Sequence, residues 1–285
     1  MAEVKAIFIK CGNLGTTMMV DMLLDERADR EDVEFRILSS SVKMDPEYVE
    51  DVVQTALDLA EDFEPDFIVY GGPNPSAPGP SKAREMLAES DYPAVIIGDS
   101  PGLKVKDEME EQGLGYILVK PDAMIGARRE FLDPIEMAVY NADLVKTLAA
   151  TGVLRLVQRA FDELIEKAKE GEITEDDLPR LVIDRNTLLD ELKDEFENPY
   201  ARAKAMAALE IAEDVADVTV EGCFMEQDKE RYVPIVASAH EMMRQAAKLA
   251  DEAREIEKSN DTVLRTPHAP DGTVLSKREL MEDPK

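Results

Sequence analysis

Residues 66–80 have the sequence DFIVYGGPNPSAPGP, and this stretch decides the fold class. Its apolar start, residues 66–69, predicts a buried strand of a parallel sheet. The four prolines and three glycines that follow exclude both helix and sheet, so a stiff, irregular loop is expected. Open α/β sheets bind ligands beside such loops, at the carboxyl ends of the strands. The stretch therefore predicts a ligand site, and the alternative is a rigid connection without a ligand.

The same succession of strand and turn recurs along the first half of the chain. Apolar runs that predict strands occupy residues 4–9, 33–38, 66–69, 94–97 and 116–119. The stretches between them, such as residues 45–62 and 81–90, predict helices. This alternation is typical of a doubly wound parallel sheet, flavodoxin-like or Rossmann-like, and predicts an α/β ligand-binding domain over residues 1–132. The turns after the strands should gather at one end of that sheet.

The turn after the first strand, residues 10–17, contains two glycines and two threonines and precedes a helix. A helix N-terminus of this kind suits an anionic group, although helix capping alone would explain it equally well. The turn is not G-x-G-x-x-G, and no acidic residue ends the strand at 33–38, so the nicotinamide fingerprint is absent. A Walker loop is excluded as well, because no Gly-Lys-Ser/Thr occurs there.

The charge of the chain is strongly unbalanced, with 62 acidic and 33 basic residues and a formal net charge of −29. Such a surface repels phosphates, so nucleic acid is excluded as a partner. Self-repulsion of this size destabilises compact and assembled states in dilute salt, whereas the Debye length falls to about 3 Å in 1 M salt. We therefore predict a salt-adapted protein from a salt-rich cytoplasm, which loses stability or dissociates in low salt.

The composition also bears on location. Hydrophobic residues make up 44% of the sequence, yet no apolar run is long enough to span a bilayer, so no membrane partner is expected. The first residues lead directly into a strand, which predicts that no signal peptide is present and that the protein is cytoplasmic. Cys11 and Cys223 lie far apart and form no CxxC, so neither a zinc site nor a disulfide framework is expected.

Residues 133–258 predict a helical-bundle region. In its last long helix, apolar residues recur at alternating spacings of four and three, which predicts a heptad seam: Ile235, Ala239, Met242, Ala246, Leu249, Ala253 and Ile256. The helix at 200–217 has a matching face of small residues, so the two should pack antiparallel. Residues 259–285 predict two short strands around a turn. Because a lone ribbon is marginally stable, this β segment should dock on the body or on a neighbouring subunit, and we expect a homo-oligomer, either a dimer or a dimer-based assembly.

Side chains for covalent catalysis are scarce. The motifs G-x-S-x-G and H-E-x-x-H are absent, and the sequence has two histidines. A structural role is favoured for His240 in the seam helix, while His268 in a Pro-rich turn is a candidate for substrate contact. Arg128 and Arg129 are candidates for binding phosphate or carboxylate, and the alternative is a surface pair that neutralises local acids. The pattern suits a reaction whose chemistry resides in bound partners that the protein orients.

Three segments closely resemble one known family. They are AIFIKCGNLG at residues 6–15, YGGPNP at 70–75 and KPDAMIGARREFLDP at 120–134, and the ending LRTPH at 264–268 follows the same pattern. These segments are similar to the coenzyme F420-dependent methylenetetrahydromethanopterin dehydrogenases of methanogenic archaea. The resemblance covers essentially the whole chain, and the segments are long enough to be specific.

The resemblance implies an oxidoreductase of methanogenic one-carbon metabolism. It would transfer a hydride reversibly between reduced coenzyme F420, a deazaflavin, and methenyl-tetrahydromethanopterin, giving methylene-tetrahydromethanopterin. Coenzyme F420 would be a dissociable co-substrate, with no metal, NAD or flavin and no obligatory side-chain acid or base. From their positions, the residues expected to bind the coenzyme are Cys11, Gly12, Asn13, Gly15, Thr16, Gly71, Gly72, Pro73, Asn74 and Ser76. Those expected to bind the pterin carrier are Asp122, Met124, Arg128, Arg129 and His268.

Two other classes of function remain open from the residues alone. One is a non-enzymatic phospho-ligand-binding module on a flavodoxin-like sheet, whose helical half would serve dimer contacts. A receiver-type phosphoacceptor is disfavoured, because the strand before the proline-rich stretch ends in Tyr70-Gly71-Gly72 without an aspartate. The other is an enzyme that uses a flavin or a nicotinamide. An absorbance assay with reduced coenzyme F420 separates these classes.

Overall fold

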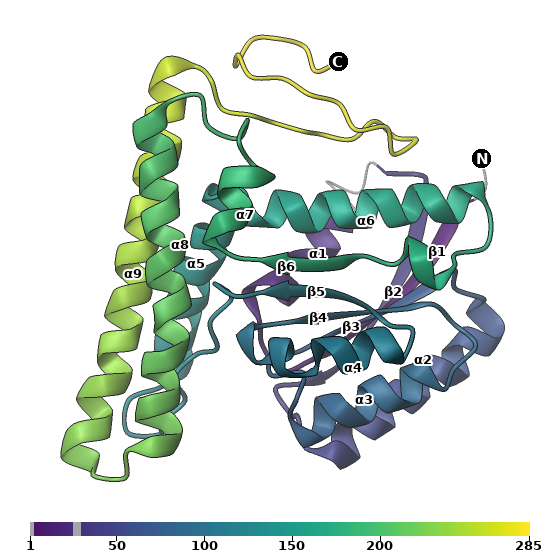
Figure 1. Ribbon diagram of the computed structural model, residues 1–285, viewed down its shortest axis with the longest axis horizontal. Coiled ribbons are helices and arrows are strands. Elements are labelled where there is room, and N and C mark those ends of the chain that lie inside the picture. The colour runs from purple at the N-terminus through teal and green to yellow at the C-terminus, as the bar shows by residue number, and fades with distance from the viewer. Residues whose placement is uncertain (1–2, 25–29) are drawn as a thin grey trace. The chain divides into compact units, whose positions relative to one another are not determined.

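A computed structural model describes residues 3–24 and 30–285 (Figure 1). A six-stranded sheet has the strand order β2-β1-β3-β4-β5-β6. The strands are β1 (Val4–Cys11), β2 (Val33–Ser41), β3 (Phe67–Gly71), β4 (Ala94–Gly98), β5 (Gly115–Val119) and β6 (Arg180–Ile183). The first five pair in parallel. Tyr116 N and Lys120 N donate to Pro179 O and Ile183 O in the same sense, so β6 extends the parallel sheet.

Helices lie on both faces of this sheet, which confirms the predicted doubly wound α/β fold. In Figure 1, α2, α3 and α4 cover one face and α1 and α6 the other. The α-helices are α1 (Gly15–Leu24), α2 (Pro46–Phe63), α3 (Pro78–Ala88), α4 (Lys106–Glu111), α5 (Pro134–Ala150), α6 (Val153–Glu170), α7 (Arg185–Asp190), α8 (Pro199–Val220) and α9 (Lys229–Asn260). Two 3-10 helices, Ser100–Val105 and Glu175–Asp177, and one π-helix, Glu221–Met225, lie between them.

The apolar runs of the sequence account for the strands. All five residues of β3, of β4 and of β5 are buried, as a central parallel strand with helices on both faces requires. The edge strand β2 mixes buried, half-buried and exposed residues. Complete burial of one aliphatic side chain stabilises the fold by about 1.5–3 kcal/mol, so these strands supply much of the core. Two of their turns, those after β1 and β3, lie at the same end of the sheet, which we call the carboxyl end.

The chain folds into two compact units that are each discontinuous in sequence. Unit 1 consists of Met1–Val119, Leu156–Val182 and Pro267–Leu275, and unit 2 of Lys120–Arg155, Ile183–Thr266 and Ser276–Lys285. The three consecutive segments expected from the sequence, with boundaries at 132 and 258, do not coincide with these units. The reason is that most of α6 and β6, which follow α5 in the sequence, belongs to unit 1.

Two local expectations differ from the structure. The strand β6 lies within a stretch that was expected to be helical, because four residues are too few for a period-two pattern to be recognised. The helix after the proline-rich stretch begins at Pro78 instead of residue 81. Its first residue is a proline, whose fixed φ and missing N–H are compatible with the first helical position.

In unit 2, the long helices α8 and α9 run antiparallel beside each other (Figure 1). The small residues expected on α8 are buried against this partner. On α9 the buried strip is wider than the predicted heptad seam, because α9 also packs against α5. Its buried residues are Tyr232, Val236, Ala239, His240, Met243, Ala246, Ala247, Ala250, Ala253 and Glu257. Ile235, Met242, Leu249 and Ile256 of the seam are half-buried.

The C-terminal segment forms the expected ribbon, reduced to two antiparallel bridges, Arg265↔Lys277 and His268↔Val274. Its middle part, Pro267–Leu275, belongs to unit 1, where Pro270 O accepts a hydrogen bond from Glu31 N. This part of the C-terminal segment therefore packs against unit 1. Within residues 3–24 and 30–285, none of the helices combines the length and the apolar character needed to cross a bilayer.

Candidate functional site

The turns after β1 and β3 meet at the carboxyl end of the sheet. A Cβ atom added to Gly12 would lie 2.7 Å from Pro73 Cδ and 2.7 Å from Met44 Sδ. A Cβ atom added to Gly72 would lie 2.5 Å from the carbonyl oxygen of Cys11. Gly12 also has a φ of 78°, which favours glycine. The structure thus brings together the two turns that the sequence proposed for coenzyme binding.

We call residues 71–77 the proline loop, and its backbone is held at several points. The loop residue Asn74 has a φ of 52°, a left-handed conformation that asparagine tolerates. Its N–H donates to Asp99 Oδ1 at 2.7 Å, and its side chain accepts from Ser76 Oγ at 2.6 Å. Arg84, whose side chain is 2% exposed, donates from Nε to the carbonyl of Pro75 at 3.2 Å. The loop is therefore fixed before any ligand binds.

Asp99 and Arg84 were not among the residues proposed from the sequence. The sequence could have identified Asp99, because this residue directly follows β4 and so belongs to a neighbouring turn at the carboxyl end of the sheet. No local pattern indicated Arg84, since a charged residue in a helix of such an acidic chain is normally interpreted as a surface residue.

The ten coenzyme candidates differ in accessibility. Gly12, Asn13, Asn74 and Ser76 are half-buried, and the other six are buried: Cys11, Gly15, Thr16, Gly71, Gly72 and Pro73. Asn13 makes no hydrogen bond to any described residue, so both its amide side chain and its backbone N–H are available to a ligand. A ligand at these turns would thus meet amide and hydroxyl groups beside the N-terminus of α1.

Two buried side chains behind these turns are kept neutral. Burial raises the pKa of the Cys11 thiol, although hydrogen bonds with Ser40 and Tyr70 act in the opposite direction. Burial also raises the pKa of the Tyr70 hydroxyl. A neutral thiol is a poor nucleophile, so Cys11 is unsuited to covalent catalysis.

The run that contains the two arginines, residues 123–131, lies in unit 2, and we call it the arginine segment. Its first residue is fixed by Tyr140, whose hydroxyl donates to the carbonyl of Ala123 at 2.9 Å. Burial and the charge of Asp122 raise the pKa of Tyr140, which keeps this donor protonated. Asp122 itself is completely buried, and Met124 is half-buried.

The two adjacent arginines have different environments. Arg128 donates from Nε to Gly222 O at 2.9 Å and from Nη2 to Glu226 O at 2.8 Å. Its guanidinium also lies 4.2 Å from the centre of the Tyr232 ring, a cation–π contact. Arg129 is exposed and forms no hydrogen bond or ion pair with the described residues. Arg128 is thus engaged in the fold, whereas Arg129 is available to a ligand.

His268 lies in unit 1, apart in sequence from the rest of the proposed carrier site. Its side chain has no exposed surface, and Nε2 lies 3.0 and 2.9 Å from the two carboxylate oxygens of Asp162. Asp162 also accepts from Arg30, which pairs with Asp32 just before β2, at the amino end of the sheet. His268 therefore belongs to a buried charge cluster at the opposite end of the sheet from the proline loop. This placement favours a structural role for His268, and its contact with substrate stays a prediction.

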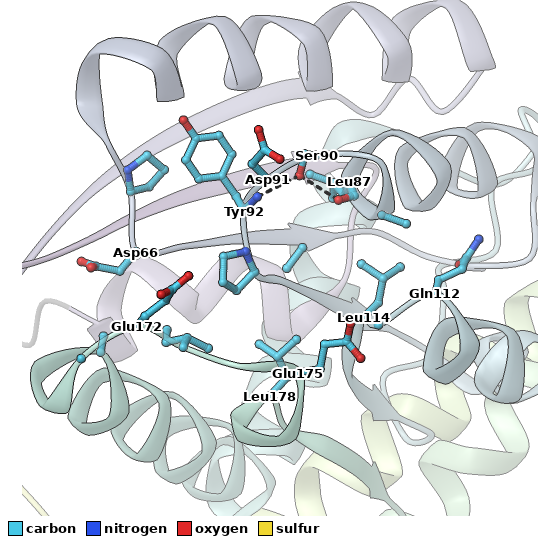
Figure 2. Close-up of a pocket in the computed structure, with 18 residues that line it drawn as sticks. Asp66, Leu87, Ser90, Asp91, Tyr92, Gln112, Leu114, Glu172, Glu175 and Leu178 are labelled. Carbon is cyan, nitrogen blue, oxygen red and sulfur yellow. Dashed lines mark hydrogen bonds between the residues drawn. The ribbon is translucent and has the colours of Figure 1, made fainter.

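The amino end of the sheet also carries an open cavity with a volume of about 620 Å³ (Figure 2). It is lined by residues before β3, β4 and β5 and by the chain after α6. Figure 2 shows Asp66 and Glu172 on one side of it and Gln112 on the other. None of the candidate site residues contributes to its lining, and its carboxylates would repel anionic ligands. This cavity is therefore not the coenzyme site that the sequence predicted.

Within the described residues, no three His, Cys, Asp or Glu side chains are placed to hold a metal ion. The loop in unit 1 has amide and hydroxyl groups, and the segment in unit 2 has an exposed arginine. Such groups bind and orient anionic organic molecules.

Comparison with known proteins places the chain among well-defined relatives. A sequence model of the family described as methylene-5,6,7,8-tetrahydromethanopterin dehydrogenase matches residues 4–285. The chain is 83% identical over 285 residues, 100% of both chains, to the F420-dependent methylenetetrahydromethanopterin dehydrogenase of Methanopyrus kandleri. It is 60% identical over 282 residues, 99% of both chains, to the enzyme of that name from Methanocaldococcus jannaschii. A solved structure of F420-dependent methylene-tetrahydromethanopterin dehydrogenase, in complex with methylene-tetrahydromethanopterin and coenzyme F420, matches with a TM-score of 0.98 at 83% identity, covering 100% of both chains.

Proposed function

This chain belongs to the methylene-5,6,7,8-tetrahydromethanopterin dehydrogenase family, and from this premise we propose which of its residues bind the two reactants. The enzyme transfers a hydride reversibly between coenzyme F420 and the one-carbon unit of tetrahydromethanopterin. The observation that carries this conclusion is the full-length identity of 83% to the relative from Methanopyrus kandleri. It favours the dehydrogenase over a non-enzymatic ligand-binding module.

Coenzyme F420 is assigned to the turns after β1 and β3. The fit rests on the polar groups that are half-buried there, the amides of Asn13 and Asn74 and the hydroxyl of Ser76. They stand beside the N-terminus of α1, where backbone N–H groups and the helix dipole favour an anionic tail. Gly12 and Gly72 allow the two turns to approach each other, since a side chain at either position would meet neighbouring atoms. The coenzyme, when bound, supplies the hydride chemistry of its deazaflavin ring.

The tetrahydromethanopterin carrier is assigned to the arginine segment. Arg129 is the exposed cation of this segment, so it is the proposed partner of an anionic group of the carrier. Met124 is half-buried and supplies an adaptable apolar contact. Arg128, also proposed from the sequence, would hold the segment in place through Gly222 and Glu226. Asp122, also proposed, is completely buried at the start of the segment. His268 is not part of this assignment.

Direct transfer between two organic molecules requires little chemistry from the protein. The reacting carbons must approach to about 3–3.5 Å, and water must be kept away. A neutral Cys11 and a protonated Tyr70 are consistent with turns that bind and orient without reacting. We therefore propose no side-chain acid, base or nucleophile for the hydride step.

An absorbance assay tests this function. Purified protein, methenyl-tetrahydromethanopterin and reduced coenzyme F420 should restore the absorbance of oxidised deazaflavin at a rate proportional to enzyme concentration. Reduced nicotinamide in place of reduced coenzyme F420 should give no methylene product. An absence of deazaflavin oxidation with both reactants present would overturn the assignment of function.

We further propose that the enzyme works in a salt-rich cytoplasm as a homo-oligomer, a dimer or a dimer-based assembly. The net charge of −29 supports the first part, because salt screens the repulsion among the acidic residues. The half-buried seam residues of α9, such as Met242 and Leu249, support the second. The midpoint of thermal unfolding should rise between about 0.1 and 1 M KCl, and light scattering should show a larger mass at the higher concentration. A midpoint that does not change with salt would contradict salt adaptation.

A further inference from the structure

His240 lies on α9 in a closely packed environment. Its Nδ1 is 2.8 Å from Glu136 Oε1, on α5. Its ring meets Phe131 edge-on with 4.8 Å between ring centres, and Tyr140 with 4.5 Å between ring centres. The His240 side chain is 5% exposed, so the orientation of its ring is fixed by these neighbours.

The second ring nitrogen of His240 has no partner. Nε2 is buried and forms no hydrogen bond with the described residues. In the neutral ring, the proton lies on Nδ1, where the Glu136 carboxylate accepts it, so Nε2 carries a lone pair and is a hydrogen-bond acceptor. A buried acceptor without a donor costs folding free energy and requires an explanation in a native structure.

The arginine segment provides donors close to this acceptor. It is held near both ends, by the hydroxyl of Tyr140 at Ala123 and by the contacts of Arg128. Between these points, residues 124–127 form no hydrogen bond with the part of the chain that the structure describes. Their N–H groups are thus unused, in a stretch without regular secondary structure.

Gly126 is the residue of this stretch that lies against α9. A Cβ atom added to it would lie 3.7 Å from His240 Nε2 and 2.7 Å from Val236 Cγ1. Only the backbone therefore fits between the segment and the helix at this point. The stretch with the unused N–H groups therefore lies beside the unused acceptor.

We propose that His240, held in one tautomer by Glu136, is a positioning residue for the carrier: its Nε2 accepts a backbone N–H of residues 124–127 when tetrahydromethanopterin is bound. The proposal rests on the assignment of the carrier to the arginine segment. Without the carrier the acceptor stays unpaired, and the middle of the segment is free to adjust. With the carrier bound, the new hydrogen bond fixes the segment and the residues that contact the carrier.

Nuclear magnetic resonance of ¹⁵N-labelled histidine tests this directly, because the chain has only two histidines, His240 and His268, to be distinguished. The spectrum of a His240→Gln variant assigns the signals. Saturation with methenyl-tetrahydromethanopterin should move the Nε2 signal of His240 from the position of a free lone pair to that of a hydrogen-bonded one, while the His268 signals stay in place. Coenzyme F420 alone should cause no such change. An Nε2 signal that does not respond to the carrier would overturn the proposal.

Two variants supply a second readout. His240→Phe keeps an aromatic ring but removes the acceptor, and it should raise the KM for the carrier about fivefold to tenfold, the effect of losing one net hydrogen bond. The KM for coenzyme F420 should remain within about twofold of the wild-type value, because the coenzyme is assigned to other residues, in the turns after β1 and β3. His240→Gln retains an acceptor oxygen and should recover most of the carrier affinity. Equal effects on both reactants, or no recovery in the glutamine variant, would overturn the positioning role.

The wild-type protein separates this proposal from the proposed function. If it does not oxidise reduced coenzyme F420 in the presence of the methenyl carrier, the function itself is wrong. If it does so while the Nε2 signal is unchanged by the carrier, the function stands and only the role of His240 is wrong.

Discussion

The proline loop in unit 1 is the proposed coenzyme site, the arginine segment in unit 2 is the proposed carrier site, and the two are held in different ways. The proline loop is fixed along its length: Asp99 accepts the N–H of Asn74, and Arg84 donates to the carbonyl of Pro75. Because residue 72 is glycine, its backbone can lie directly against the backbone of Cys11. The arginine segment is fixed near its ends, and residues 124–127 form no hydrogen bond with the described residues.

The difference indicates how the two reactants are bound. A loop that is already ordered loses little entropy when a ligand binds, so the coenzyme would meet a preformed surface. A segment with unused N–H groups can adjust to its ligand, at an entropic cost that the carrier must offset. If this comparison is correct, substitutions in the loop should act on the ligand-free protein, and substitutions in the segment should act on binding.

The largest expected effect comes from adding a methyl group at Gly72. The new Cβ atom would lie 2.5 Å from the carbonyl oxygen of Cys11, and a backbone carbonyl within a sheet cannot move away cheaply. Gly72→Ala should therefore lower the free energy of unfolding by about 2–4 kcal/mol, within the range of severe overpacking. Urea unfolding of the ligand-free protein measures this change.

Gly126→Ala is the matched substitution in the arginine segment. There the new Cβ atom would meet Val236 Cγ1 at 2.7 Å, a side-chain methyl group in contact with an adjustable segment. The loss of stability should be smaller, about 1 kcal/mol, and Val236→Ala should restore it. Equal destabilisation by the two alanine substitutions would remove the distinction between a fixed loop and an adjustable segment.

Much of this fold could be predicted from local patterns in the sequence. The contacts that fix the proline loop could not. Continuous apolar runs predicted β3, β4 and β5, and the density of proline and glycine predicted the irregular loop after β3. Asp99, however, accepts a hydrogen bond from Asn74, which is 25 residues away in the sequence. Arg128 donates to Gly222, which is 94 residues away. Local patterns carry no information on such contacts.

The same limit applies to the environments of the proposed site residues. Arg128 and Arg129 are equivalent in the sequence, and only the position of the turn between α8 and α9 distinguishes them. His268 appeared available in a Pro-rich turn, but α6 contributes Asp162 to it from more than a hundred residues away. β6 was missed because a strand of four residues is too short for a periodic pattern.

The largest effect on the kinetics should come from Asp99. Asp99→Ala removes the acceptor of the Asn74 N–H from a buried site, so the proline loop should lose its left-handed turn at Asn74. We expect the KM for coenzyme F420 to rise about tenfold, equivalent to about 1.4 kcal/mol. Steady-state kinetics with each reactant varied separately measures the effect. Asp99→Asn keeps the acceptor oxygen and should lie close to wild type, and a tenfold effect on the carrier instead of the coenzyme would contradict the assignment.

Acid should affect unit 1 before it affects the anchors of the arginine segment. Burial alone would raise the pKa of Asp32, but hydrogen bonds from Arg30 and Lys169 outweigh it and lower the pKa from 3.8 to about 2. A carboxylate with a depressed pKa in the folded state stabilises the fold above its unfolded pKa, and this contribution disappears as the pH falls from about 4 to 2. The loss should be about 1–2 kcal/mol.

Urea unfolding across this pH range measures the loss. The Asp32→Asn variant should show a weaker dependence of the free energy of unfolding on pH, and a lower stability at neutral pH. Tyr140 and Arg128 donate to backbone carbonyls, which do not titrate, so hydrogen exchange near residues 123 and 128 should not respond to the same pH change. Simultaneous loss of protection in both regions would show that they are not held independently.

The smallest expected effect separates the two neighbouring arginines. Arg129 is exposed and unpaired among the described residues, so Arg129→Ala should leave stability and kcat unchanged and raise the KM for the carrier about threefold, as for one solvent-exposed charge. Arg128→Ala should instead lower the free energy of unfolding by about 1 kcal/mol, because two backbone carbonyls lose their donor. Thermal unfolding and carrier kinetics, measured for both variants, distinguish a ligand contact from an anchor. If Arg129→Ala left the KM for the carrier unchanged, Arg129 would not contact the carrier. Because Arg128 is engaged in the fold, the assignment of the segment as the binding surface would then fail.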